Sequence, residues 1–306
     1  MIDIDSAPIK TYASNAAISN EDKSMYVGFE LNKYNFLTKL DENIRKEFKE
    51  QAKGRHDNLS SYLIGTFKNK EVIDAKKISD NIFPFRQADI FLSHSHADED
   101  KAIELAVSLQ RKGLKVFVDS CAWGHFHNLL DDLNEIYAEP VRNGGQTIYN
   151  YRKATELTAA IHMMLTGALH AMIKRSEIFV FLNTENSVPL KSYQSVDRTF
   201  SPWLYSELQF SCYVENDTPK RRLKLATESY DAASPLIKST ASARSDAVLA
   251  FEAFNRHLPK VTGSEMEEWY DKSHPSSGNL TSGEVAMDAL YDTLGIEERF
   301  LDLKSR

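Results

Sequence analysis

Cysteine is almost absent from this chain, which has only Cys121 and Cys212 among its 306 residues. Two cysteines in a chain of this size do not make the disulfide framework that stabilises many small secreted domains. We therefore expect both thiols to be reduced, as in a reducing compartment. The residues from Met1 to Ser6 are acidic and lack the basic and apolar regions of a signal peptide. These two features predict a cytoplasmic protein.

The chain also lacks an excess of positive charge and a long hydrophobic run. Lys and Arg number 37 against 44 Asp and Glu, for a net charge of −7. Without a basic excess to displace counterions from phosphates, nucleic acid is not expected as the main partner. The most apolar stretch, residues 158–173, is interrupted by His162, Thr166 and His170. It is too short and too polar for a bilayer span, so no membrane partner is expected.

The first 85 residues predict a helical N-terminal extension. Residues 1–20 show little periodicity, whereas a helical pattern runs from about residue 25 to residue 53. A second short helix is expected around Tyr62, Leu63 and Phe67. The pattern in the first helix rests on apolar residues three or four positions apart: Leu37, Leu40, Ile44 and Phe48.

From residue 88 the pattern changes to that of an α/β sheet. Residues 89–93 and 115–119 are short apolar runs typical of buried strands, and the segment between them reads as a helix ending at Gly113. Two strands joined by a crossover helix make a parallel βαβ unit. Residues 177–182 predict a third strand, and we expect about five parallel strands in all.

The remaining segments are expected to alternate between helices and loops, with weaker signals after residue 217. Ser201 and Pro202 suit the N-cap and first position of a helix. Helices are predicted at 128–137, 155–175, 201–213, 248–254, 264–271 and 282–294, strands at 222–227 and 258–262, and loops at 120–127, 140–146 and 183–200.

Four pieces of the chain, in this order, resemble the Toll/interleukin-1 receptor (TIR) domain family. Asp89 to His96 reads Asp-Ile-Phe-Leu-Ser-His-Ser-His and resembles the first TIR strand. Gly113 to Asp119 resembles the second strand with its terminal Asp, and Trp123-Gly124 resembles the BB loop that follows. Trp203 precedes Glu207 by four residues, as in the TIR helix that carries the catalytic carboxylate.

The resemblance implies a flavodoxin-like fold over residues 86–306, preceded by the extension over residues 1–85. It covers residues 86–130 and 176–214 best. The segment near 140–175 is longer than usual and implies an insertion, and the part after 215 is divergent.

Many TIR domains cleave NAD⁺ at the bond between nicotinamide and ribose, and the resemblance implies that activity here. The reaction passes through a positively charged ribose that a nearby carboxylate stabilises. Glu207 is carried over as that carboxylate, and Trp203 lies one turn earlier on the same helical face. Nicotinamide is a good leaving group, so NAD⁺ is the substrate and neither a metal nor another cofactor is expected.

Further substrate-binding residues are expected at the carboxyl ends of the first two strands, where α/β sheets bind ligands. Ser93 and His94 follow the first strand, and Asp119 ends the second. Trp123 and Phe126 belong to the segment that resembles the BB loop.

Two other functions are compatible with the sequence. His94, His96 and Asp98 also resemble the His-x-His-x-Asp motif of metal-dependent hydrolases, although Glu99 stands where that family has His. Alternatively, the chain is a non-catalytic TIR scaffold that acts by self-association.

The TIR reading further implies TIR–TIR assembly and a role in antiviral defence of the Thoeris kind. In such systems an ADP-ribose product, cyclic or linear, signals to a downstream effector. The residues leave open whether the product is made by hydrolysis or by cyclisation.

Overall fold

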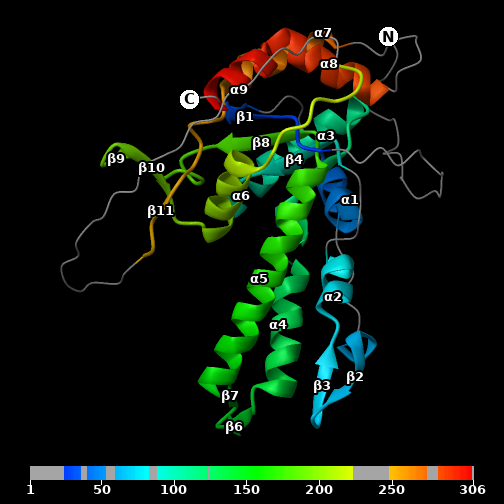
Figure 1. The fold of residues 1–306 in the computed structure, drawn as a ribbon, viewed down its shortest axis with the longest axis vertical. Helices are drawn as coiled ribbons and strands as arrows, with labels where there is room; N and C mark the ends of the chain where they lie inside the picture. Colours follow the sequence, from blue (N-terminus) through cyan, green and yellow to red (C-terminus); the bar gives the residue numbers. More distant parts are fainter. Residues whose placement is uncertain are drawn as a thin grey trace.

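The computed structural model describes residues 24–35, 40–52, 59–82, 88–122, 124–222, 248–273 and 282–304. At its centre is a five-stranded parallel sheet in the order β12-β1-β8-β4-β5 (Figure 1). Every residue of β4 and of β8 is buried, as expected for strands covered on both faces. The strands of this sheet are β1 (Val27–Asn32), β4 (Ile90–Ser93), β5 (Val116–Val118), β8 (Ile178–Asn183) and β12 (Lys260–Thr262). The predicted α/β class and parallel sheet are confirmed.

The order of the strands is compatible with a flavodoxin-like sheet. Counted from β5, the positions 2-1-3-4-5 of such a sheet are filled by β5, β4, β8, β1 and β12. The strand in the fourth position comes from the N-terminal part of the chain and pairs in parallel with both β8 and β12. The sequence after residue 215 shows no clear fourth strand, because β1 fills the fourth position of the sheet.

The prediction of a helix from residue 25 onward is wrong for residues 27–32. Val27, Phe29 and Leu31 alternate with less apolar residues, which is the period of a strand rather than that of a helix. The helix in this region is α1, which begins only at Glu42. The expected boundary between residues 85 and 86 consequently does not coincide with the boundary of the sheet, since one of the inner strands precedes it.

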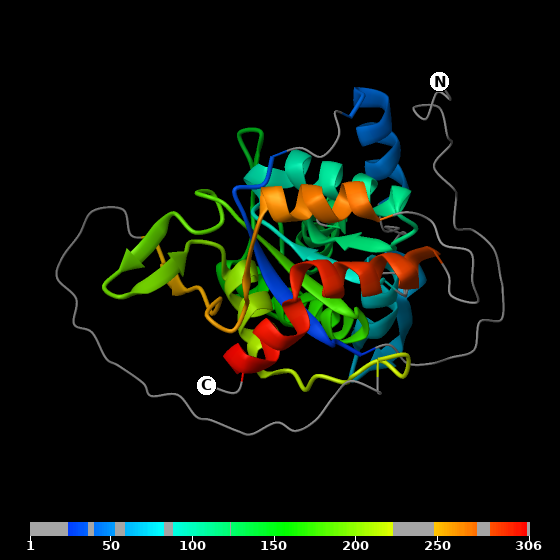
Figure 2. The same cartoon turned by 90° about the horizontal axis from the view of Figure 1, so that it is seen from above.

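Helices cover both faces of the sheet (Figure 2). Helices α3 and α7 lie side by side, and Lys112 at the end of α3 donates a hydrogen bond to the carbonyl of Ser273, just after α7, at 2.9 Å. Helices α5 and α6 pack together elsewhere, with the His170 ring stacked on Phe210 at 4.2 Å. The helices are α1 (Glu42–Ala52), α2 (Ala75–Ile82), α3 (Glu99–Arg111), α4 (Gly124–Tyr137), α5 (Tyr151–Arg175), α6 (Pro202–Tyr213), α7 (Gly263–Lys272), α8 (Ser282–Leu294) and α9 (Ile296–Lys304), with short 3-10 turns η2 (Leu59–Tyr62), η3 (His96–Asp98) and η4 (Asp119–Ala122).

The helices predicted at 155–175, 201–213, 264–271 and 282–294 are confirmed to within four residues at each end. The helix predicted at 248–254 is wrong, because β11 lies there. Short hairpins also occur where loops were predicted at 140–146 and 183–200 and where a short helix was predicted around Tyr62, Leu63 and Phe67. Strands of a few residues show too little alternation to be recognised in the sequence. These small sheets are formed by β2 (Leu63–Phe67) with β3 (Lys70–Ile73), β6 (Val141–Asn143) with β7 (Gln146–Ile148), and β9 (Leu190–Tyr193) with β10 (Val196–Thr199) and β11 (Phe251–Glu252). The strand predicted at 222–227 lies almost wholly outside the described residues.

One part of the molecule projects away from the central sheet. It consists of α4, much of α5, and α2 with the hairpins β2–β3 and β6–β7 (Figure 1). By length and composition alone, α5 is apolar enough to cross a membrane, and 28% of its most apolar window is buried. Its buried residues lie between Ile161 and Ile173, toward the end nearer the sheet, and include Leu165, Leu169 and Met172.

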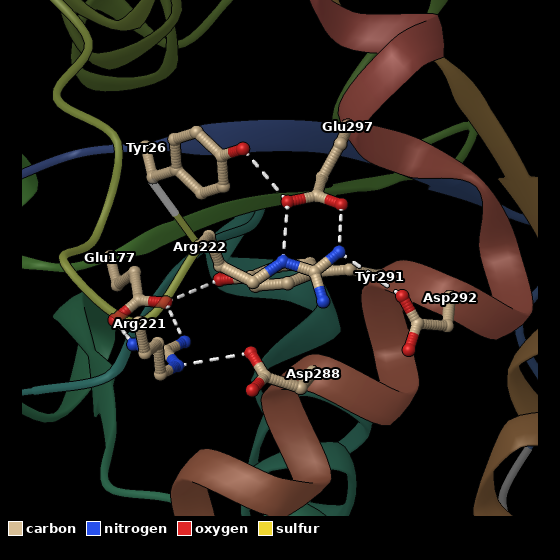
Figure 3. A network of polar contacts seen from close by, with 8 residues as sticks. All are labelled: Tyr26, Glu177, Arg221, Arg222, Asp288, Tyr291, Asp292 and Glu297. Atoms are coloured by element: carbon tan, nitrogen blue, oxygen red, sulfur yellow. Dashed lines mark hydrogen bonds and ion pairs between the residues drawn. The ribbon is translucent and has the colours of Figure 1, made fainter. Parts of the chain in front are cut away.

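A network of charged and phenolic side chains fastens the C-terminal helices to the sheet (Figure 3). Arg221 forms a forked pair with the buried Glu177, which precedes β8, and also donates to Asp288 of α8 at 3.0 Å. Tyr291 of α8 donates to the same Glu177 carboxylate at 2.6 Å. The adjacent Arg222 bridges α8 and α9 through Asp292 and Glu297, and Glu297 accepts from Tyr26, next to β1.

A buried histidine that contacts α6 is expected to make the fold sensitive to acid. His257 contacts the hydroxyl of Ser211 at 3.0 Å. Burial, together with the positive charge of Lys304, lowers the pKa of His257 from 6.5 to about 3. Between these two values the unfolded chain binds a proton that the folded chain does not, so stability falls as the pH falls.

We expect His257 to lower the free energy of unfolding by about 3 kcal/mol at pH 4 relative to pH 7. Urea unfolding at both pH values measures this difference. In the variant His257→Gln, which keeps a donor for Ser211, the pH-dependent loss should shrink by that amount. An unchanged loss in the variant would mean that other groups cause it.

Candidate functional site

Polar side chains gather where β4 and β5 end, at the carboxyl edge of the sheet. Ser93 is the last residue of β4, and Asp119 directly follows β5. The chain leaves β4 toward β5 on one side and later returns to β8 on the other side. The boundary between β4 and β8 is thus a topological switch point, which is where open α/β sheets bind ligands.

Helix α6 brings Glu207 to this edge. The helix begins where predicted, because the Ser201 side chain accepts a hydrogen bond from the backbone amide of Leu204 and Pro202 occupies the first turn. Glu207 is 0% exposed, and its Oε2 accepts a hydrogen bond from the Ser93 hydroxyl at 2.6 Å. Among the described residues, no donor reaches its other oxygen, Oε1.

The surroundings of Glu207 shift the pKa of its carboxyl group. Burial and then the negative charge of Asp119 raise the pKa of Glu207 well above its usual value, and the Ser93 hydroxyl opposes this shift. Asp119 is within hydrogen-bond reach of the protonated Glu207 carboxyl. The pair therefore favours one shared proton over two adjacent negative charges.

His94 lies on the other side of Asp119 and is buried. Its Nδ1 is 3.1 Å from Asp119 Oδ1, and its Nε2 is 2.9 Å from the hydroxyl of Ser120. Burial opposes a charge on the imidazole, but Asp119 outweighs it and the pKa of His94 is raised. Both ring nitrogens are engaged within the protein, so in this conformation His94 supports Asp119 instead of presenting a free nitrogen to a ligand.

The alternative metal motif, His94 with His96 and Asp98, does not assemble into a site. His96 is exposed, whereas Asp98 is buried and accepts hydrogen bonds from Thr184 and from Asn186, the latter at 3.0 Å. In the part of the chain that the structure describes, no group of three or more His, Cys, Asp or Glu side chains is placed to hold a metal ion. Asp98 instead links the turn after β4 to the loop after β8.

The predicted aromatic residues are only partly placed. The Trp203 indole is half-buried and stacks on His162 of α5, with the ring centroids 5.4 Å apart. Trp123 lies outside the described residues. Phe126 falls in the first turn of α4, although nothing of its side chain is described. A loop was expected over residues 120–127, but η4 and the first turn of α4, which begins at Gly124, occupy most of this segment.

A second polar cluster, which the sequence did not suggest, adjoins the first. Glu30 of β1 is 1% exposed and accepts hydrogen bonds from three amides, those of Asn32, Asn183 and Asn255. A charged residue within an apolar strand was the only local sign of it. A cavity of about 380 Å³ lies next to this cluster and is lined by Asn255, Asp197 and Lys260.

A second cavity, of about 320 Å³, lies between α2 and α5, and neither cavity is lined by Glu207. The buried group around Glu207 is the stronger candidate site, because a carboxyl pair with a perturbed pKa at a switch point is a stronger sign of function than either of these two cavities.

Comparisons of the chain with protein-family models, with curated proteins and with solved structures found no match.

Proposed function

We propose that this protein is a TIR-type enzyme that cleaves NAD⁺ into nicotinamide and an ADP-ribose product, linear or cyclic. The observation that carries the proposal is the buried carboxyl of Glu207, hydrogen-bonded to Ser93 and adjacent to Asp119 at the switch point of the sheet. Ser93, Asp119 and Glu207 are the residues expected from the resemblance, and they come from three separate elements.

The chemistry of NAD⁺ suits this carboxyl pair. The nicotinamide ring is a cation, so its arrival beside Glu207 favours the ionised carboxylate, and the displaced proton passes to solvent. The bond between the ring and ribose then breaks with its electrons leaving on nicotinamide. The ionised Glu207 stabilises the positive charge that develops on ribose, and Ser93 continues to donate to it. Attack by water gives ADP-ribose, whereas attack by a ring nitrogen of adenine in the same molecule gives a cyclic product, and either route releases one proton.

The described conformation is closed over Glu207, so turnover requires an opening of the site. We propose that self-assembly, or a trigger acting on it, provides that opening, and that the product signals to an effector in antiviral defence. At the switch point, hydrogen bonds from Thr184 and Asn186 to Asp98 join the loop after β8 to the turn after β4.

The test is nicotinamide release from NAD⁺ by the purified full chain, measured by chromatography over a range of protein concentrations and with a crowding agent. Light scattering in the same samples reports assembly. We expect release to rise with assembly, and the co-product to identify hydrolysis or cyclisation. Assembled protein that releases no nicotinamide would overturn the proposal.

A non-catalytic scaffold is the second candidate, and complete burial of Glu207 is the observation that favours it. A scaffold needs no access to that carboxyl. The same experiment separates the two functions, because a scaffold assembles without consuming NAD⁺.

A further inference from the structure

The orientation of the Asn183 side chain is set by Glu30. A carboxylate can only accept hydrogen bonds, so each amide that contacts it must turn its NH₂ group inward. Asn183 Nδ2 donates to Glu30 Oε1 at 2.8 Å, and Asn32 Nδ2 donates to the same oxygen at 2.8 Å. Asn255 Nδ2 donates to Glu30 Oε2 at 2.9 Å. The hydrogen-bond network thus fixes which end of the Asn183 amide faces Glu30.

The other end of this amide is left without a donor. Asn183 is 5% exposed, and its Oδ1 has no hydrogen-bond partner among the described residues. A buried carbonyl oxygen that is not paired lowers stability, so most such groups in proteins find a partner. A donor group on a water molecule or on a bound ligand can supply the partner that this oxygen lacks.

The register of the strands places Asn183 near Glu207. Ser93, which bonds Glu207, lies beside Phe181 of β8, and Asn183 is two residues further toward the carboxyl end. Residues two apart on a strand share a face, so Ser93, Phe181 and Asn183 all face the side of the sheet where Glu207 lies. From strand spacing and rise, the Cα atoms of Ser93 and Asn183 are about 8 Å apart. The unpaired Oδ1 of Asn183 and the carboxyl group of Glu207 therefore flank the same part of the sheet edge.

We propose that Asn183 is a substrate-positioning residue whose Oδ1 accepts a hydrogen bond from the carboxamide NH₂ of the nicotinamide ring. This inference rests on the proposed function. Glu207 acts at the ribose carbon, and the carboxamide projects from the pyridinium ring away from that carbon. Asn183 lies on the same sheet face as Ser93 and further toward the carboxyl end, so the position of its Oδ1 matches that arrangement. Glu30 holds the Asn183 side chain in place through the NH₂ end of the amide.

The experiment compares equilibrium binding of NAD⁺ and of its 3-acetylpyridine analogue, in which a methyl group replaces the carboxamide NH₂. Titration calorimetry uses the full chain carrying Glu207→Gln, so that substrate is not consumed, under the crowded conditions in which light scattering reports assembly. With Asn183 intact we expect NAD⁺ to bind about tenfold more tightly than the analogue. Adding Asn183→Leu should abolish that preference. Adding Asn32→Leu should preserve it, since this control removes an equivalent hydrogen bond to Glu30.

Equal affinities for the two ligands with Asn183 intact would overturn the inference without the need for any variant at this position. A preference that survives Asn183→Leu would overturn it as well. If NAD⁺ fails to bind, the inference fails, and nicotinamide release by the wild-type chain then shows whether the proposed function fails with it.

Discussion

Replacing Glu207 by glutamine is expected to lower nicotinamide release about a thousandfold, the effect of removing a main electrostatic stabiliser of a transition state. Glutamine has nearly the same shape and can still accept the Ser93 hydrogen bond, but it cannot become negatively charged. The folded state should be as stable as that of the wild type or more so, because the substitution removes a buried ionisable group next to Asp119. Activity and urea unfolding measured on the same preparation separate loss of chemistry from loss of fold.

Glu215 provides the matched control for this substitution. It lies just beyond α6 and is exposed, so Glu215→Gln makes the same chemical substitution without touching the site. We expect wild-type activity from this control. If Glu207→Gln kept more than a tenth of the wild-type rate, the carboxylate that stabilises the ribose cation would have to be sought elsewhere.

Replacing Arg221 by methionine is expected to lower the free energy of unfolding by about 3 to 5 kcal/mol, as when one partner of a buried ion pair is removed. Glu177 is buried, and only the hydrogen bond from Tyr291 would remain of the side-chain contacts that Figure 3 shows for its carboxylate. The substitution also loses the contact with Asp288 that holds α8. Urea unfolding at pH 7 measures the effect.

Two controls test whether the loss of stability arises because the buried charge of Glu177 has no ion-pair partner. The double variant Arg221→Met with Glu177→Gln should recover much of the stability, because no buried charge then lacks its partner. Lys76→Met breaks an ion pair between Lys76 and Asp80 whose side chains are 81% and 56% exposed, and should cost less than about 1 kcal/mol. A similar loss in all three variants would contradict a specific role for the network.

The elements that carry the candidate site could be predicted from the sequence because short-range patterns mark them, whereas the role of Glu207 came from the resemblance to TIR domains. The apolar runs of β4 and β5 are local signals, and each is followed at once by a polar residue, Ser93 or Asp119. The Ser201-Pro202 start likewise fixed the helix that carries Glu207. Parallel strands end at the same edge of a sheet, so the sequence alone was sufficient to bring Ser93 and Asp119 together.

Only the tertiary structure decided what these residues contact. Trp203 and Glu207 share a helical spacing, yet the indole stacks on His162, because the placement of α5 determines which neighbour each side of α6 meets. His94 pairs with Asp119 rather than facing a ligand, because the turn after β4 folds over the end of β5.

The position of β1 was the largest feature that the sequence left undetermined. Its alternating residues indicate a strand, but nothing local indicates that Val27 pairs with Ile178 or that Glu30 pairs with Lys260. Strand pairing over such separations depends on the free energy of the whole sheet. The sequence by itself therefore determined β4, β5 and α6 and the site residues that they carry, whereas the fold decided the order of the strands and, through Glu30, the orientation of Asn183.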